Sequence, residues 1–126
     1  AFGIQLTHLL WVRCGGNVEH ALKATDLLIR AGGFGMVILD LTGAPYASSR
    51  RIPLTSWFRL RHGASQSGAA LIVTAQDIHA GSCSQLQIEL RQHQAIWSGK
   101  LLRGMIALAG LRKRNQMRTA SFRIAR

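Results

Sequence analysis

The sequence predicts an α/β fold in which a partly parallel sheet is flanked by helices and extended by antiparallel strands. Two apolar runs, 35–41 and 69–75, lack polar alternation, which is typical of central parallel strands buried on both faces. A stretch with helical character precedes each run. From residue 96 onward, shorter apolar stretches separated by glycines favour strands joined by turns.

The first third of the chain predicts a strand, a helix and a second strand. The run 9–14 is short and apolar and is followed by two glycines, so we expect a buried strand. Asn17 can cap the next helix through its side-chain oxygen. Apolar residues at helical spacing extend that helix over 18–31. The strand at 35–41 then carries Asp40 near its end.

The middle of the chain predicts a loop, a helix and a third strand. Residues 42–51 contain a glycine, a proline and two adjacent arginines, which indicates a loop. Pro53 can start a helix at its first turn, and we expect that helix to end near His62, before the glycines at 63–68. The strand at 69–75 is followed by Gln76, and we expect this strand to lie beside the strand at 35–41 as its parallel neighbour.

The last third predicts a short helix followed by strands. Ser82 can cap a helix over 83–91. Strands are expected at 96–97 and 101–111, interrupted by Gly99 and Gly104, and at 119–125, with a basic turn at 112–115. The whole chain, residues 1–126, is expected to form one domain.

Positive charge is concentrated in the later part of the chain. There are 16 Lys and Arg against 5 Asp and Glu, a net charge of +11. Residues 1–49 hold three bases and three acids, so the entire excess lies in 50–126. This asymmetry indicates a polyanionic partner or an acidic protein surface, and a solvated basic face without a partner is the alternative.

The sequence contains no pattern typical of a metal site, a catalytic serine or a membrane segment. The two cysteines, Cys14 and Cys83, form no C-x-x-C pair, and the histidines lack metal-ligand spacing, so no metal site is predicted. No serine lies in a nucleophile elbow, so no catalytic residue is predicted. No apolar run reaches about 20 residues and no basic leader is visible, so we expect a cytoplasmic location and no membrane partner.

The order of elements and its landmarks resemble the core of the RecA recombinases, a P-loop NTPase-type fold, over about residues 3–125. The landmarks are 17–40, a helix leading to an apolar strand that ends in aspartate; 69–76, a strand with a terminal glutamine; and the basic residues 112–114. A closer resemblance is to the ImuA-type RecA-like accessory proteins of bacterial mutagenic repair, especially those of soil bacteria. It is carried by the strings LLWVRC at 9–14, ALKATDLL at 21–28 and RIPLTSWFR at 51–59.

The resemblance implies a role in the SOS response, in damage-induced translesion synthesis beside a polymerase-type protein partner. It also implies that RecA-like self-association is possible, and it implies no established chemistry.

A phosphate-binding loop is missing from the matched part. The loop needs the signature G-x-x-x-x-G-K-S/T, whose backbone and lysine cradle phosphates. The one Gly-Lys pair, Gly99-Lys100, is followed by Leu101. We therefore expect a core that is truncated at its start or has lost the loop, with no ATPase activity of its own. ATP and Mg²⁺ are expected as cofactors only if a loop lies upstream.

The resemblance assigns positions to several residues. Asp40 takes the Walker B-like position and Gln76 the nucleotide-sensing position, and both are expected to be vestigial here. The alternative for Asp40 is a strand-end aspartate with local bonds. The alternative for Gln76 is a polar residue that ends a strand. Residues 42–51 take the place of the first DNA-binding loop and 77–81 that of the second, which is short for RecA-type strand exchange. DNA or partner contacts are expected from these basic residues: Arg50, Arg51, Arg112, Lys113, Arg114 and Arg118.

Three functions remain open at this point. The first is a RecA-like accessory module in DNA repair without ATPase activity. The second is a fragment of an ATP-dependent, DNA-binding RecA-type recombinase. The third is a basic module that binds an acidic protein surface and no DNA.

Overall fold

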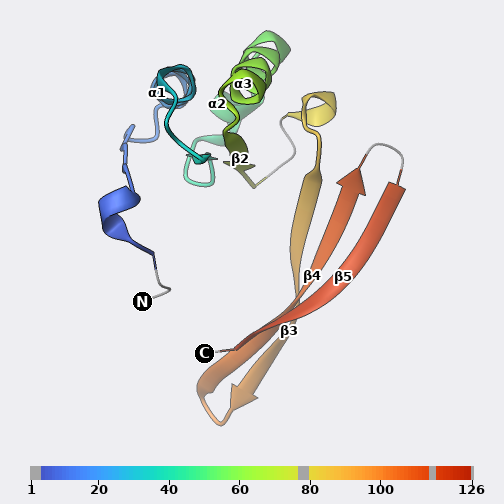
Figure 1. The fold of residues 1–126 in the computed structure, drawn as a ribbon. Coiled ribbons are helices and arrows are strands. Elements are labelled where there is room, and N and C mark those ends of the chain that lie inside the picture. Colours follow the sequence, from blue (N-terminus) through green and yellow to red (C-terminus); the bar gives the residue numbers. More distant parts are fainter. Residues whose placement is uncertain (1–3, 77–79, 114–115, 126) are drawn as a thin grey trace. The chain divides into compact units, whose positions relative to one another are not determined.

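The computed structural model describes residues 4–76, 80–113 and 116–125. It has a mixed α/β fold with a parallel two-stranded sheet flanked by helices and an antiparallel three-stranded sheet (Figure 1). The chain divides into two compact units, 1–83 and 84–126, and each is described by itself. Among the described residues the antiparallel strands hydrogen-bond as a sheet of their own, whereas they were expected to extend the parallel sheet.

The parallel sheet of the first unit consists of β1 (Met36–Asp40) and β2 (Ala70–Thr74). The two strands pair in register from Met36 opposite Ala70 to Asp40 opposite Thr74. The ladder continues one step further, since the backbone N–H of Leu41 donates to the carbonyl of Thr74 at 2.8 Å. The prediction that these two runs are parallel neighbours is confirmed.

Helix α1 (Val18–Ala31) begins where the sequence predicts. The side-chain oxygen of Asn17 accepts a hydrogen bond from the backbone N–H of His20 at 3.0 Å, which is the expected cap. Gly32 follows the helix with a φ of 71°, a conformation that glycine adopts at little cost.

Helix α3 (Leu54–Ser67) starts after Pro53 as predicted, but the prediction that it ends near His62 is wrong. The helix continues through Gly63 and ends before Gly68, whose φ is 73°. Gly63 lies where α3 approaches α1, because a Cβ added there would lie 3.0 Å from Cγ2 of Ile29. Glycine is used inside this helix for close packing and does not end it.

The core of the first unit lies between these helices and one face of the sheet. Ile29 of α1 and Leu60 of α3 are each 1% exposed, and Val37 and Leu39 of β1 are buried with them. Met36 and Ile38, which alternate with them, are 54% and 60% exposed. The expectation that β1 is buried on both faces is therefore wrong within the described residues. Figure 1 shows α1, α2 and α3 beside the short strand β2.

Two further predictions in the first unit are wrong. Residues 9–14 form no strand, and the large side chains among them are exposed, from 47% for Leu9 to 75% for Trp11. Apolar composition alone does not make a strand, because a strand also needs a neighbour for its backbone hydrogen bonds, and no described strand pairs with this segment. Residues 42–51, expected as a loop, contain the short helix α2 (Tyr46–Arg50). A 3-10 turn, η1 (Leu6–His8), precedes the extended segment.

The second unit consists of three antiparallel strands, β3 (Gln87–Ser98), β4 (Leu101–Lys113) and β5 (Gln116–Ala125). The predicted helix over 83–91 is wrong. A 3-10 turn, η2 (Gly81–Cys83), is followed by β3, whose residues 87–91 alternate between polar and apolar. That two-residue period fits a half-buried strand and outweighs the single capping signal of Ser82. The predicted strands over 101–111 and 119–125 are confirmed, and β4 continues through Gly104 beside a shift in register.

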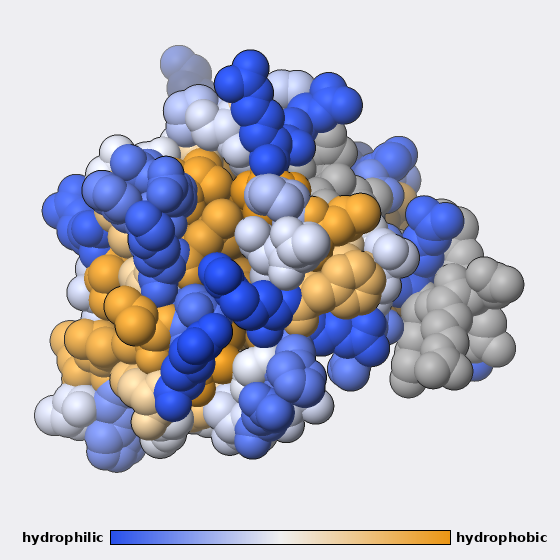
Figure 2. Space-filling model, turned by 90° about the horizontal axis from the view of Figure 1, so that it is seen from above, coloured by the Kyte–Doolittle hydropathy of each residue, from blue (hydrophilic) through white to orange (hydrophobic). Residues whose placement is uncertain are grey.

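One face of the antiparallel sheet is rich in apolar side chains. Leu90, Ala109 and Ala120 lie opposite one another across the three strands, and Ala107 pairs with Phe122 on the same face. The other face carries Arg91, whose neighbours across the sheet are Leu108 and Ser121. Several apolar side chains of the first face are exposed, with Leu90 at 65%. Figure 2 shows orange apolar side chains at the surface between blue hydrophilic ones.

No helix in the described ranges is both long and apolar enough to cross a membrane. Cys14 and Cys83 are both free thiols.

Candidate functional site

Asp40 joins the ends of the two parallel strands through its Oδ1 atom. That oxygen accepts hydrogen bonds from the backbone N–H of Thr42 at 3.0 Å and from the hydroxyl of Thr42 at 2.7 Å. It accepts a third from the hydroxyl of Thr74 on β2 at 2.8 Å. These local bonds make Asp40 a link between β1 and β2.

These bonds lower the pKa of Asp40. The largest cause is the hydrogen bond from the backbone N–H of Thr42, followed by those from the hydroxyls of Thr42 and Thr74, which favour the charged carboxylate. A lowered folded-state pKa contributes stability that is present above the ordinary carboxylate pKa of about 4. That stability is lost as the pH falls through the lowered value.

We therefore expect acid to destabilise the native chain more than the Asp40→Asn variant, which keeps an acceptor oxygen but does not titrate. The measurement is urea unfolding of both proteins at several pH values from about 6 down to about 2. The difference between their free energies of unfolding should shrink at the acidic end. A difference that stays constant with pH would show that the charge of Asp40 does not matter for the fold.

Gln76 lies at a bend two residues after β2 and is exposed. Because β1 and β2 are parallel, Asp40 at the end of β1 and Gln76 just after β2 lie at the same edge of the sheet, as the sequence predicts. Thr42 and Thr74 belong to this edge as well and were missed. Their signal was available, since a threonine follows Asp40 by two residues and another ends the neighbouring strand.

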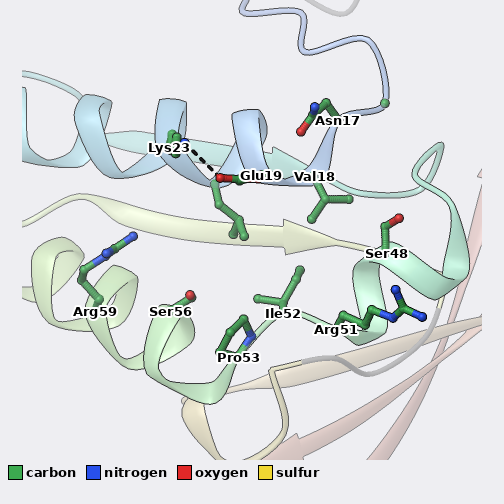
Figure 3. A pocket seen from close by; sticks show the side chains of 12 residues that line it. Asn17, Val18, Glu19, Lys23, Ser48, Arg51, Ile52, Pro53, Ser56 and Arg59 are labelled. Atoms are coloured by element: carbon green, nitrogen blue, oxygen red, sulfur yellow. Dashed lines mark ion pairs between the residues drawn. The ribbon is translucent and has the colours of Figure 1, made fainter.

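Arg50 and Arg51 are adjacent in sequence but have different surroundings. The guanidinium of Arg50 lies over the ring of Tyr46, 5.3 Å from its centroid. Arg51 forms no ion pair with any residue of the described ranges. It lines a pocket in the first unit (Figure 3).

That pocket has a volume of about 610 Å³ and lies between the start of α1 and the connection from α2 into α3. Its cationic side chains are Lys23, Arg51 and Arg59, and its one carboxylate is Glu19. The rest of the lining consists of the apolar residues Val18, Leu22, Ile52 and Pro53, the hydroxyl-bearing Ser48 and Ser56, and Gly16 and Asn17. Lys23 and Arg59 were not predicted as site residues, since the packing of α1 near α3 is what brings them to one pocket.

Two of the cationic side chains that line the pocket form ion pairs with carboxylates. The ammonium of Lys23 lies 3.0 Å from Oε1 of Glu19, which lowers the pKa of Glu19 through a hydrogen bond first and through charge attraction second. Nε of Arg59 lies 3.5 Å from Oδ1 of Asp26, and Arg30 also pairs with that carboxylate at 3.2 Å. Both partners of the Lys23–Glu19 pair are solvent-exposed, so this pair contributes little to stability, whereas the side chain of Asp26 is only 18% exposed.

The structure describes only part of the basic cluster that was predicted near the end of the chain. Arg112 lies in β4 and Arg118 in β5, where Arg118 pairs with Leu111. Since Leu111 and Arg112 are neighbours in one strand, Arg112 and Arg118 lie on opposite faces of the sheet. The backbone of Lys113 ends β4, and Arg114 lies outside the described residues, as does most of the second predicted DNA loop at 77–79.

Register places two other arginines on the same face of the sheet as Arg112. Arg91 pairs with Leu108, and Arg123 pairs with Ile106. Leu108 and Ile106 lie four and six residues before Arg112 in β4. Because these are even numbers, their side chains lie on the face of β4 that carries Arg112. We call this set the arginine face: Arg91, Arg112 and Arg123. Arg91 and Arg123 were missed, because their common face depends on strand register.

Acidic side chains do not gather in the described parts of the chain. No group of three or more His, Cys, Asp or Glu side chains lies close enough there to hold a metal ion. In comparisons with known proteins, no protein-family model matches this sequence, and no curated protein is significantly similar to it.

Proposed function

We propose that this chain is a RecA-like accessory module of bacterial DNA repair and damage-induced translesion synthesis that binds DNA and has no ATPase activity of its own. The observation that supports it most is the parallel pairing of β1 with β2, which places Asp40 and Gln76 at the same edge of the sheet. The sequence strings that resemble ImuA-type proteins support it too. So does the chain's lack of a G-K-S/T loop.

The DNA-binding part of the proposal rests on charge. The chain carries a net charge of +11, and the arginine face presents arginines from three neighbouring strands, of which Arg91 is paired with Glu89 at 2.6 Å. Arginine pairs with phosphate oxygens through two parallel hydrogen bonds, so it suits a nucleic-acid backbone. We propose single-stranded or locally opened DNA in the cytoplasm as the ligand, and a repair polymerase-type protein as the partner.

The test is binding of a fluorescein-labelled single-stranded oligonucleotide at salt concentrations from about 50 to 300 mM, measured by anisotropy. Each phosphate contact contributes about 0.7 to the slope of log affinity against log salt, so three contacts should give a slope near about −2. Lack of binding even at the lowest salt would refute the DNA-binding role. It would favour the third function, a module for an acidic protein surface.

A second expectation concerns assembly. Side chains such as Trp11, Ile38 and Leu90 are each at least 60% exposed, and monomers rarely leave large apolar patches open to water. The purified chain should therefore self-associate or remain poorly soluble without a partner. Light scattering coupled to size-exclusion chromatography measures this, and a monodisperse monomer at high concentration would contradict the expectation.

A further inference from the structure

The pocket of the first unit carries excess positive charge. Three cationic side chains line it against the single carboxylate of Glu19. Lys23 neutralises Glu19 at 3.0 Å, which leaves Arg51 and Arg59. Arg59 is partly engaged with Asp26 at 3.5 Å, whereas Arg51 pairs with no carboxylate in the described ranges. An anion entering this pocket would therefore meet Arg51 as the most available cation.

The pocket also has apolar surface that a bare ion would not need. Val18, Leu22, Ile52 and Pro53 give it apolar surface, and Ser48 and Ser56 add hydroxyl groups. A volume of about 610 Å³ lies within the range of about 300–1,000 Å³ that small organic ligands occupy. A cation at one end of an apolar surface matches a ligand with a charged group at one end and a weakly polar body, which describes a nucleotide.

Figure 3 shows that the lining comes from two sides. Asn17, Val18, Glu19 and Lys23 come from the start of α1, and the residues from Ser48 to Arg59 lie across from them. Both sides belong to one compact unit, and α1 and α3 share the buried core of that unit. The pocket is therefore held by the same packing that orders the helices.

We infer that this pocket binds one nucleotide of a DNA single strand, with Arg51 on the phosphate and the apolar lining residues against the sugar or base. The inference rests on the proposed DNA-binding function and adds a defined subsite to it.

The test compares charge-matched variants of the full chain in the anisotropy assay. Arg51→Gln should weaken binding of a single-stranded oligonucleotide by about three- to five-fold and reduce the salt slope by about 0.7. Arg61→Gln is the control: Arg61 is an exposed arginine of α3 that does not line the pocket, so its loss should change affinity by less than about two-fold. Glu19→Gln should act in the opposite direction and raise affinity about two- to three-fold, because it removes the one carboxylate of the pocket.

The outcomes separate the two proposals. Equal losses for Arg51→Gln and Arg61→Gln would overturn the pocket while DNA binding by the chain stands. No binding by the native chain would overturn the proposed function, and the subsite with it. If Arg51→Gln does not fold, as judged by circular dichroism, the Glu19→Gln variant still tests the subsite. An affinity of Glu19→Gln for the oligonucleotide that is equal to or lower than that of the native chain overturns the subsite. Displacement of the oligonucleotide by inorganic phosphate at matched ionic strength would show a simple phosphate site and overturn the nucleotide assignment.

Discussion

Replacing Ile29 with alanine should lower the free energy of unfolding of the first unit by about 2–5 kcal/mol, the range for truncating a fully buried isoleucine. Ile29 is 1% exposed and lies in the core with Leu60 and Val37. Its removal leaves a cavity between α1, α3 and β1 that the surrounding elements fill incompletely. The measurement is urea unfolding followed by the fluorescence of Trp57, which is 3% exposed in the same core.

Two controls make this measurement specific. Trp11 and Trp97 are 75% and 61% exposed, so replacing both with phenylalanine leaves Trp57 as the single tryptophan reporter. Leu27 lies in the same helix but is 68% exposed, and Leu27→Ala should change stability by no more than about 0.5 kcal/mol. Equal effects of Ile29→Ala and Leu27→Ala would contradict the described packing of α1.

Replacing Gly63 with valine should destabilise the first unit by about 1–3 kcal/mol, the usual cost of overpacking a core. A Cβ at this position would lie 3.0 Å from Cγ2 of Ile29, so the branched side chain forces α1 and α3 apart. The smaller Gly63→Ala change sets this strain against a gain of about 1 kcal/mol in helix propensity.

A double variant isolates the contact between Gly63 and Ile29. In the Ile29→Ala background Cγ2 is gone, so Gly63→Ala should be clearly more favourable there than in the native chain. Urea unfolding of the four proteins in this cycle gives the coupling energy directly. Additive effects within about 0.3 kcal/mol would show that the two residues do not touch.

Much of the first unit could be predicted because its signals are local. Asn17 caps α1 through a bond to a residue three positions away, and Pro53 precedes the start of α3. The parallel pairing of β1 and β2 followed from two apolar runs, each preceded by a helix. The carboxyl-edge positions of Asp40 and Gln76 followed from that pairing.

The failures come where a local signal competes with pairing or packing. Residues 9–14 have the composition of a buried strand but no strand partner among the described residues. Ser82 looked like a helix cap, yet the alternation that begins at Gln87 favours β3. Gly63 looked like a helix end, but it serves the approach of α3 to Ile29.

The candidate sites were foreseen less completely, for the same reason. Arg51 was predicted from an arginine pair in a loop, whereas Lys23 and Arg59 reach the same pocket through helix packing. Arg112 and Arg118 looked like one cluster in the sequence. Strand register separates them and brings Arg91 and Arg123 to the face of Arg112 instead.

The central claim is that the chain binds DNA without hydrolysing ATP. The most direct measurement mixes the purified chain with single-stranded DNA and Mg²⁺-ATP and follows oligonucleotide anisotropy and phosphate release in one sample. The account predicts salt-sensitive DNA binding that is the same with and without ATP, and no phosphate release above the protein-free rate. DNA-stimulated phosphate release at an ordinary P-loop rate, lost on denaturing the chain, would contradict it.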